Sequence, residues 1–317
     1  MLAEGGYSFV YLVQELPTLE NLHARTREFA LKKVLAVTSE GLAMAQREID
    51  VMRRLHHPCL LPLLGASITP QVDEEHGSKY LVLMLFPLYT AGSLFDELWR
   101  QAAAGTRLPL RDVLSIFLQV ALGVQAMHGL QPPLAHRDVK PHNVLLEVGS
   151  TEGEDAAEAL AAQPVQNDDK AVPGGGRFRA VLMDFGSARQ ARINVRSRAE
   201  ALAAQEDAEA HCSAPYRAPE LWDVASACRL DERVDIWSLG CLLYFVMHGV
   251  SPFERVLGEA GGSLALAVIN GRLGWPPGDP YPEDARDLVR FCLAPDPAQR
   301  PFADAVVARA QDVLARC

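Results

Sequence analysis

Short apolar runs containing β-branched and aromatic residues dominate the first third of the chain. Residues 1–35 contain a glycine-bearing turn between such runs, and they lead into the sequence FALKKVLAV at 29–37. The sequence KYLVLMLF at 79–86 is apolar at almost every position. Runs of this length and composition predict β-strands, and the second run predicts a buried one.

Helical spacing of apolar residues appears between these runs and dominates from about residue 94. One apolar stripe consists of Leu42, Ala45, Ile49 and Met52. It predicts a helix over 39–55 with Ser39 as the N-cap. Similar patterns cover 110–128 and 234–248, so the chain divides into a small strand-rich part and a larger helical part.

Two segments depart from these patterns. Residues 147–177 are rich in Gly, Ala and acidic residues, and their seven acids against two bases supply half of the net charge of −10. This composition predicts a disordered, solvated insertion, with an acidic interaction segment as the alternative. Residues 199–211 are rich in Ala and Glu, which is typical of a short surface helix.

Composition and charge narrow the class of protein. The 317 residues suit one large two-lobed domain or two small ones, and 49% hydrophobic with 22% charged residues is typical of a folded protein. A net charge of −10 argues against a nucleic-acid partner, because nucleic-acid-binding proteins carry a basic excess. None of the six cysteines occurs as C-x-x-C, which favours reduced thiols in an intracellular, cytoplasmic protein over zinc or disulfides.

We expect no signal peptide and no transmembrane segment in the sequence. The longest apolar stretch, at 237–247, is too short for a transmembrane segment. The first residues show neither the charged region nor the apolar core of a signal peptide, and position 2 is Leu where N-myristoylation needs Gly. We therefore expect no transmembrane segment, and no membrane anchor is visible in this N-terminus.

The most specific chemical signal is the sequence HRDVKPHN at 136–143, followed by an apolar run and DFG at 184–186. Phosphoryl transfer from ATP needs a carboxylate that orients and deprotonates the attacking hydroxyl. It also needs oxygen ligands for a metal ion bridging the phosphates, and a cation near the moving phosphoryl group. The two motifs contain groups of these kinds, namely Asp138, Lys140, Asn143 and Asp184.

These motifs resemble those of eukaryotic protein kinases. The resemblance implies that Asp138 is the catalytic base assisted by Lys140, and that Asn143 and Asp184 hold Mg²⁺. The implied fold is α+β and bilobal, with an antiparallel-sheet N-lobe at 1–86, whose first strand is truncated, and a helical C-lobe at 87–317. The insertion then lies on the hairpin between the strands that carry Asn143 and Asp184, where extra length costs little.

The resemblance also implies a ligand for the α- and β-phosphates of ATP. Ala30-Leu31-Lys32 is similar to the A-x-K strand of kinases and assigns this role to Lys32. Alternation alone does not separate Lys32 from Lys33, because both faces of the strand carry apolar residues. The expected partner is Glu48, which borders the apolar stripe and has no base three or four positions away; an ordinary surface acid is the alternative.

The residues of the phosphate loop and of the adenine site are assigned from the resemblance alone. The frame of the kinase loop G-x-G-x-x-G retains its middle glycine, so Gly5 and Gly6 are the candidates for backbone contact with phosphate. With Phe86 as gatekeeper, adenine would bind the carbonyl of Pro87 and the N–H of Tyr89. The residues expected to enclose the base are Val10, Ala30 and Leu145, which are otherwise ordinary core residues.

The segment after DFG resembles a kinase activation segment. Phe185 and Gly186 open it, Ala218-Pro219-Glu220 closes it, and the resemblance implies that Glu220 pairs with Arg300. Asp235 begins the sequence DIWSLG, which matches the start of the central helix of the C-lobe. Lys140 together with Ser213 is typical of serine/threonine rather than tyrosine kinases.

Several longer stretches are similar to the Numb-associated kinase family, nearest to its branch of the myristoylated and palmitoylated serine/threonine kinase. These stretches are EGGYSFVYLV, AQREIDVMRRLHHP, VLMDFGSARQ, SAPYRAPEL and DERVDIWSLGCLLY. That family has a helix inside its activation segment, which residues 199–211 would supply.

The implied function is transfer of the ATP γ-phosphoryl group, with Mg²⁺, to serine or threonine hydroxyls of protein substrates. One alternative is a pseudokinase scaffold, which the incomplete glycine loop favours. The other is a small-molecule kinase of related fold, which would lack the A-P-E sequence.

Overall fold

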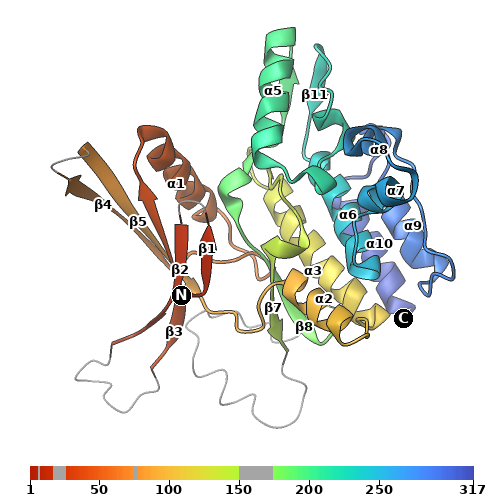
Figure 1. Cartoon of the computed structure of the whole chain (residues 1–317), viewed down its shortest axis with the longest axis horizontal. Helices are drawn as coiled ribbons and strands as arrows, with labels where there is room; N and C mark the ends of the chain where they lie inside the picture. Colours follow the sequence, from red (N-terminus) through yellow and green to blue (C-terminus); the bar gives the residue numbers. More distant parts are fainter. Residues whose placement is uncertain (6–7, 17–25, 74–76, 150–173) are drawn as a thin grey trace. The chain divides into compact units, whose positions relative to one another are not determined.

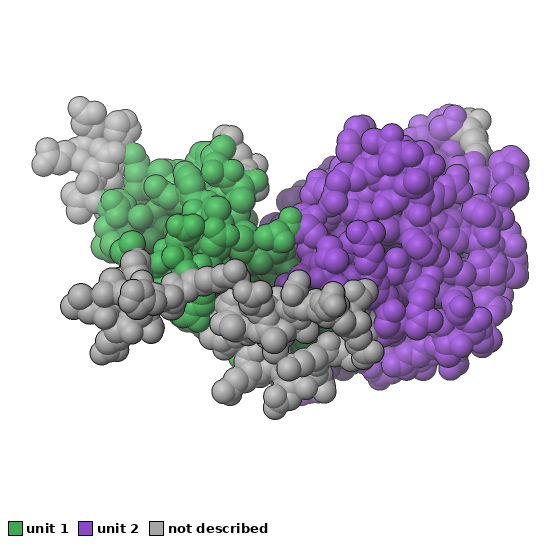
Figure 2. Space-filling model, turned by 90° about the horizontal axis from the view of Figure 1, so that it is seen from below, with its two compact units in different colours: residues 1–90, 150–170 green, residues 91–149, 171–317 purple. Residues whose placement is uncertain are grey.

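The computed structural model describes residues 1–5, 8–16, 26–73, 77–149 and 174–317. They form two compact units, the first comprising the described residues up to Thr90 and the second starting at Ala91 (Figures 1 and 2). Gly6 and positions 150–173 of the predicted insertion lie outside the described residues.

The first unit contains a five-stranded antiparallel sheet in the order β1-β2-β3-β5-β4. Its strands are β1 (Ala3–Gly5), β2 (Ser8–Gln14), β3 (Glu28–Ala36), β4 (Gly65–Asp73) and β5 (Gly77–Pro87). The strands predicted at 29–37 and 79–86 are thus confirmed as β3 and β5, which pair with each other inside the sheet. Successive side chains of each strand alternate between the two faces of the sheet, and both strands carry apolar residues on both faces.

Helix α1 (Ser39–Met52) packs against β3 and β5 and buries Ala45, Ile49 and Met52. The predicted helix is confirmed, but the N-cap is Thr38 and not Ser39. Thr38 has an extended backbone, and its hydroxyl accepts a hydrogen bond from the N–H of Gly41 at 3.0 Å. This geometry is that of a capping residue, whereas Ser39 already belongs to the first helical turn.

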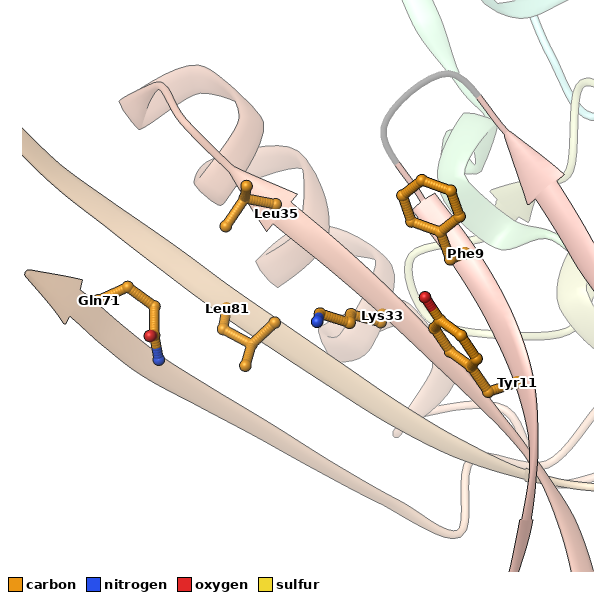
Figure 3. A pocket seen from close by; sticks show the side chains of 6 residues that line it. All are labelled: Phe9, Tyr11, Lys33, Leu35, Gln71 and Leu81. Atoms are coloured by element: carbon orange, nitrogen blue, oxygen red, sulfur yellow. The ribbon is translucent and has the colours of Figure 1, made fainter. Parts of the chain in front are cut away.

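Alternation along β3 sends neighbouring lysines to opposite faces of the sheet. Lys32 points to the face on which α1 lies, since it pairs with Glu48 of that helix. Lys33 lies on the other face, in a shallow pocket of about 260 Å³ that it shares with Phe9, Tyr11, Leu35, Gln71 and Leu81 (Figure 3). The structure therefore separates two lysines that periodicity left equivalent.

The second unit is mainly helical. Its helices are α2 (Leu94–Ala103), α3 (Leu110–His128), α5 (Arg198–His211), α6 (Arg233–His248), α7 (Pro252–Ala260), α8 (Leu264–Asn270), α9 (Glu283–Cys292) and α10 (Ala303–Ala315). The helices predicted at 110–128, 199–211 and 234–248 are confirmed as α3, α5 and α6. Helix α3 packs against α6 and α10, and α6 packs against α9, so that these four helices form the core.

Three two-stranded ribbons complete the second unit. They pair β6 (Leu134–Ala135) with β9 (Arg189–Gln190), β7 (Val144–Val148) with β8 (Phe178–Leu182), and β10 (Ile193–Val195) with β11 (Cys228–Leu230). The β7–β8 hairpin lies on α3, where buried Gln119 donates to the carbonyl of Phe178 at 2.9 Å and accepts from the N–H of Ala180 at 2.8 Å. This contact fixes the strand that leads to Asp184.

The predicted insertion lies between β7 and β8, as expected, but both of its ends are ordered. Glu147 and Val148 belong to β7, and the N–H of Gly149 donates to the carbonyl of Arg177 at 2.8 Å. Arg177 in turn donates its N–H to Asp112 of α3 at 2.8 Å. These contacts hold the two ends of the insertion close together.

Among the described residues, α3 is the single helix that is long and apolar enough to cross a membrane. Most of it is buried in the second unit, where it contacts α6, α10 and β8, as a core helix of a globular domain does. Helices α6 and α7 are long and apolar enough to cross a membrane only if they are taken together as one span. The two helices are bent by 62° relative to each other.

Candidate active site

In the first unit, the expected ion pair between Lys32 and Glu48 is present. The ammonium of Lys32 lies 2.7 Å and 3.0 Å from the two carboxylate oxygens of Glu48. Glu48 is 9% exposed, so water screens the pair only weakly. Glu48 therefore holds the Lys32 ammonium in a defined position on the α1 side of the sheet.

The candidate adenine and phosphate residues of the first unit gather on the same face of the sheet as Lys32. Val10 lies directly opposite Lys32 on β2, and Ala30 lies two positions before it on β3. Phe86 is opposite Ala30 on β5 and is buried. Residues directly opposite or two apart on a strand share a face, so these side chains line one surface.

For the remaining candidate ATP-binding residues, the structure gives the strand position and the burial. Pro87 ends β5, and Pro87 and Tyr89 are half-buried. Gly5 ends β1, where it pairs with Ser8. Leu145 belongs to the second unit, lies on β7 opposite Val181 and is half-buried.

In the second unit, the carboxylate of Asp138 contacts donor groups of three other residues. One oxygen accepts from the N–H of Ser213 at 3.1 Å. The other lies 2.7 Å from the ammonium of Lys140 and accepts from the side-chain amide of Asn143 at 3.0 Å. Lys140 also donates to the Ser213 hydroxyl at 2.8 Å, so four predicted site residues meet at one carboxylate.

These contacts decide the charge of Asp138. Burial by itself would raise the pKa of the carboxyl, but the hydrogen bonds from Lys140 and Ser213 lower it more, so the pKa lies below its usual range. Asp138 is therefore ionised at neutral pH and can accept a proton from a hydroxyl group.

The backbone of this loop is held by a buried carboxylate. Asp235 at the start of α6 accepts hydrogen bonds from the N–H groups of His136 and Arg137, each at 2.7 Å. It also lies 2.9 Å from the ring of His128. Burial would raise the pKa of Asp235, yet His128 and the other donors keep it below its usual range, so the anchor is an ionised carboxylate.

His136 links the Asp138 loop to the segment containing Asp184. Its Nδ1 accepts the N–H of Asp138 at 3.2 Å, and its Nε2 lies 3.1 Å from the carbonyl of Met183. A carbonyl only accepts, so Nε2 carries the hydrogen and the ring is the neutral Nε2–H tautomer. The buried ring of Phe185 packs edge-on against His136, with 5.5 Å between centroids.

A backbone hydrogen bond brings Asn143 next to the residue that precedes Asp184. The N–H of Met183, the residue before Asp184, donates to the carbonyl of Asn143 at 2.9 Å. Asn143 uses its amide nitrogen for Asp138, which leaves its side-chain oxygen as an acceptor. Asp184 is exposed and has φ of 66°, a left-handed conformation that Asp tolerates better than most residues, and its carboxylate accepts the N–H of Gly186 at 3.4 Å.

This donor set fits Mg²⁺. The ion prefers oxygen ligands, and in nucleotide sites it is held by one or two carboxylates together with phosphate oxygens and water. Among the residues that the structure describes, no group of three or more His, Cys, Asp or Glu side chains could hold a metal by itself. A metal at Asn143 and Asp184 would therefore take further ligands from phosphate and water.

Arg137 connects the loop with the activation segment. Its φ is 72°, and its guanidinium forms an ion pair with Asp207 on α5. Asp207 also pairs with His211 at 3.1 Å, and His211 lies 3.4 Å from the guanidinium of Arg189. Helix α5 thus supplies a negative charge to the arginine that precedes Asp138.

The expected pair between Glu220 and Arg300 is present, with Arg300 buried and Glu220 half-buried. Two parallel hydrogen bonds of 2.7 Å and 3.0 Å join the guanidinium to the carboxylate. The other N–H groups of Arg300 donate to the carbonyls of Arg233, Ala294 and Pro295. Arg300 therefore ties the end of the activation segment to α6 and to the segment after α9.

Three contributors to the site were not predicted from the sequence: His128, Asp207 and the backbone N–H of Ser213. His128 ends an apolar helix, and its polar ring was the one available signal. Asp207 is flanked by Glu206 and Glu209, and no spacing rule distinguishes these acids. The amide of Ser213 has no side-chain signature at all.

Similarity to known proteins extends over almost the whole chain. A family model described as "Protein kinase domain" matches residues 2–310. Serine/threonine-protein kinase 16 of Mus musculus is 36% identical over 300 residues, covering 95% of this chain and 84% of the relative. Serine/threonine-protein kinase ENV7 of Saccharomyces cerevisiae is 30% identical over 335 residues, covering 99% and 90%. A probable serine/threonine-protein kinase of Dictyostelium discoideum is 32% identical over 314 residues, covering 86% and 80%.

Proposed function

This chain belongs to the protein kinase family and is a serine/threonine-protein kinase, and on that premise we propose which of its residues carry out phosphoryl transfer. The observation that supports the proposal most directly is the arrangement around Asp138, an ionised carboxylate bonded to Lys140, Asn143 and Ser213.

Asp138 acts as the catalytic base. The hydroxyl of a substrate serine or threonine gives its proton to the carboxylate while its oxygen forms a bond to the γ-phosphorus. The bond between this phosphorus and the β–γ bridging oxygen breaks, and ADP leaves. Lys140 keeps Asp138 ionised and offsets negative charge on the phosphoryl group in transfer.

Protein kinases use ATP with Mg²⁺, and the proposed ligands in this chain are the side-chain oxygens of Asn143 and Asp184. When bound, Mg²⁺ neutralises part of the charge on the phosphates. Lys32, oriented by Glu48, binds the α- and β-phosphates. The backbone of Gly5 and Gly6 contacts the phosphates, Pro87 and Tyr89 bind the adenine edge, and the side chains around the base are Val10, Ala30 and Leu145.

The remaining residues of the site have positioning roles in this proposal. Asp235 and His136 hold the loop of Asp138, and Phe185 with Gly186 shapes the turn after Asp184. Ser213 contacts the base, and the pair of Glu220 with Arg300 secures the end of the activation segment.

Within the protein kinases we place the chain in the Numb-associated family, in the branch of the myristoylated and palmitoylated serine/threonine kinase. Helix α5 inside the activation segment supports this placement.

The proposed lobes are residues 1–86 and 87–317, and the boundary between the two compact units at Thr90 and Ala91 is four residues from that division. A cytoplasmic location is supported by the six free cysteines, four of which are buried.

The test is the substitution Asp138→Asn, with Asp223→Asn, an exposed acid of the same unit, as the matched control. We expect Asp138→Asn to lower transfer to a serine or threonine peptide by about 10²–10⁴-fold, because the amide cannot accept the proton. The thermal shift produced by Mg·ATP should persist, and the control should keep the wild-type rate. A wild-type rate in Asp138→Asn would refute the assignment of the base.

A further inference from the structure

The β10–β11 ribbon and the residues on either side of β10 carry a concentration of positive charge. Residues 189–198 contain four arginines and no acidic residue, in a chain whose net charge is −10. Arg229 on β11 adds a fifth guanidinium, directly opposite Asn194 of β10. Helix α5 and strand β11 project at the same end of the second unit (Figure 1).

The pairing register assigns these side chains to one face of the ribbon. Val195 and Leu230 are buried, so the face to which they belong is turned towards the protein. Asn194 and Arg229 are opposite each other on the other face, and Arg192 and Arg196 flank β10 at the alternating positions. All four are exposed, and we call the surface formed by Arg192, Asn194, Arg196 and Arg229 the basic face.

Part of the charge of this face is available for a ligand. The Glu200 carboxylate accepts the backbone N–H of Arg196 at 2.7 Å, and Asp231 interacts electrostatically with Arg229. Arg192 is bound to Glu232 at 2.6 Å, which neutralises one guanidinium. For Arg196 and Arg229, no ion pair occurs with the residues described by the structure. Two exposed guanidinium groups with a neutral amide between them form a surface suited to carboxylates, which accept parallel hydrogen bonds from arginine.

Both strands of the ribbon are attached to the loop that contains Asp138. Strand β9 precedes β10 and pairs with β6, directly before His136, and the N–H of Ala191 donates to Pro133 at 2.9 Å. Strand β11 leads into α6, where Asp235 binds the backbone of the same loop. The chain path through β6 and β9 limits the separation of Arg196 and Asp138 to about 40 Å, a span of about twelve residues of extended peptide.

We propose that the basic face binds acidic residues of the protein substrate, located within about twelve positions of the phosphorylated serine or threonine. The proposal rests on the serine/threonine kinase function and names the class of substrate on which it acts. An anionic membrane surface would offer negative charge as well, but the basic face is joined to the catalytic loop, where the acceptor segment of a protein substrate must lie. This connection favours the peptide.

The experiment uses three sets of synthetic peptides that contain a single serine or threonine. Blocks of Asp, Asn or Lys are placed four to twelve residues before or after the acceptor, and kcat/KM is measured with Mg·ATP. We expect the wild-type chain to favour the Asp peptides over the Asn peptides by about tenfold, and the preference should decline between 50 and 500 mM salt as charges are screened. Transfer to the Asn peptides reports kinase activity itself, so an inactive enzyme is distinguished from an unselective one.

The variant that tests the surface is the double substitution Arg196→Glu and Arg229→Glu. We expect it to abolish or invert the ratio of kcat/KM for Asp and Asn peptides. Arg272→Glu, which changes an exposed arginine elsewhere in the same unit, should leave the ratio unchanged. Thermal unfolding checks the double variant, and if it does not fold, Arg229→Gln and the salt dependence of the wild type provide the same test.

Three results would overturn the proposal. The first is equal kcat/KM of the wild type for Asp and Asn peptides, and the second is an unchanged preference in the folded double variant. The third is loss of binding to phosphatidylserine vesicles in the double variant with no effect on peptide selection, which would assign the basic face to a membrane surface.

Discussion

At the scale of single residues, the charge of Asp138 depends on a balance between burial and its neighbours. Burial favours the neutral carboxyl, whereas Lys140 and Ser213 favour the carboxylate. The neighbours prevail, and the depressed pKa keeps the ionised form dominant at every pH above it. Activity that requires this carboxylate is therefore lost only as the pH falls through the depressed pKa.

Replacing Lys140 by Met should shift this balance. The variant retains burial but loses the ammonium 2.7 Å from the carboxylate, so the pKa of Asp138 rises and the acid limb of kcat/KM moves to higher pH. The measurement is the pH profile of kcat/KM between pH 4 and 8. Lys140→Arg retains the positive charge and should leave the limb nearer to its original position. An acid limb at the same pH in Lys140→Met and wild type would show that Lys140 does not set the ionisation of the base.

The side chain of Arg300 donates hydrogen bonds to several segments of the chain at once. All five of its N–H groups donate, two to Glu220 and three to backbone carbonyls. A lysine has three donors without the planar fork, so Arg300→Lys leaves buried acceptors without partners. We expect a loss of about 3 kcal/mol in the free energy of unfolding, measured with denaturant. Arg316→Lys alters an exposed pair with Asp284 and should change stability by less than about 1 kcal/mol. Equal effects of the two substitutions would contradict the structural role of Arg300.

At the scale of elements, the contact between α6 and α9 depends on Gly240. A Cβ at this position would lie 2.7 Å from Leu293 and 2.8 Å from Cys292, closer than carbon atoms normally approach. The glycine therefore sets the spacing of two core helices, although helix propensity alone favours alanine there.

Gly240→Ala distinguishes these two effects. Propensity predicts stabilisation by about 1 kcal/mol, but the close contact predicts destabilisation by about 1–3 kcal/mol, and we expect the second. Gly258→Ala in α7 is the matched control, since nothing lies within 4 Å of its added Cβ, and it should be neutral or stabilising. Equilibrium unfolding in urea measures both. A stabilised Gly240→Ala variant would mean that α9 shifts to make room for the methyl group without loss of folding free energy.

At the scale of the whole molecule, the chain accommodates a long insertion between β7 and β8 without separating their ends. The strands remain paired from Val144 to Val148, and the Gly149–Arg177 hydrogen bond continues the ladder. Beyond it, Arg111 donates to the carbonyl of Gly175 at 3.3 Å and Asp112 accepts from Arg177. Residues 174–177 are therefore part of the packed unit.

Replacing residues 150–173 by a four-residue Gly/Ser linker should leave the fold and the active site intact. A shorter loop loses less entropy on closure, so we expect stability to rise by roughly 1–2 kcal/mol and kcat/KM to stay within a few-fold of wild type. Removing residues 174–177 as well should destabilise the protein, because the contacts with α3 are lost. Thermal unfolding and peptide phosphorylation measure both deletions. A large loss of activity from the shorter deletion would show that residues 150–173 take part in function.

The sequence alone predicted the strands β3 and β5, the helices α1, α3, α5 and α6, and the chemistry of the Asp138 and Asp184 motifs. These features are encoded locally, in periodicity and in residues at short fixed spacing, so they can be predicted without coordinates. The pairs of Lys32 with Glu48 and of Glu220 with Arg300 were predicted from family resemblance, and the structure contains both.

The tertiary structure distinguished residues that local sequence patterns leave equivalent. It separated Lys32 from Lys33, selected Asp207 among neighbouring acids for Arg137, and brought the amide of Ser213 to Asp138 across 75 positions of sequence. It also fixed the tautomer of His136 through Met183 and gathered the arginines that flank β10 with Arg229 of β11 on one face. The physical reason is the same in each case: a hydrogen bond or ion pair depends on distances between atoms, and residues far apart in the chain acquire these distances only when the core packs.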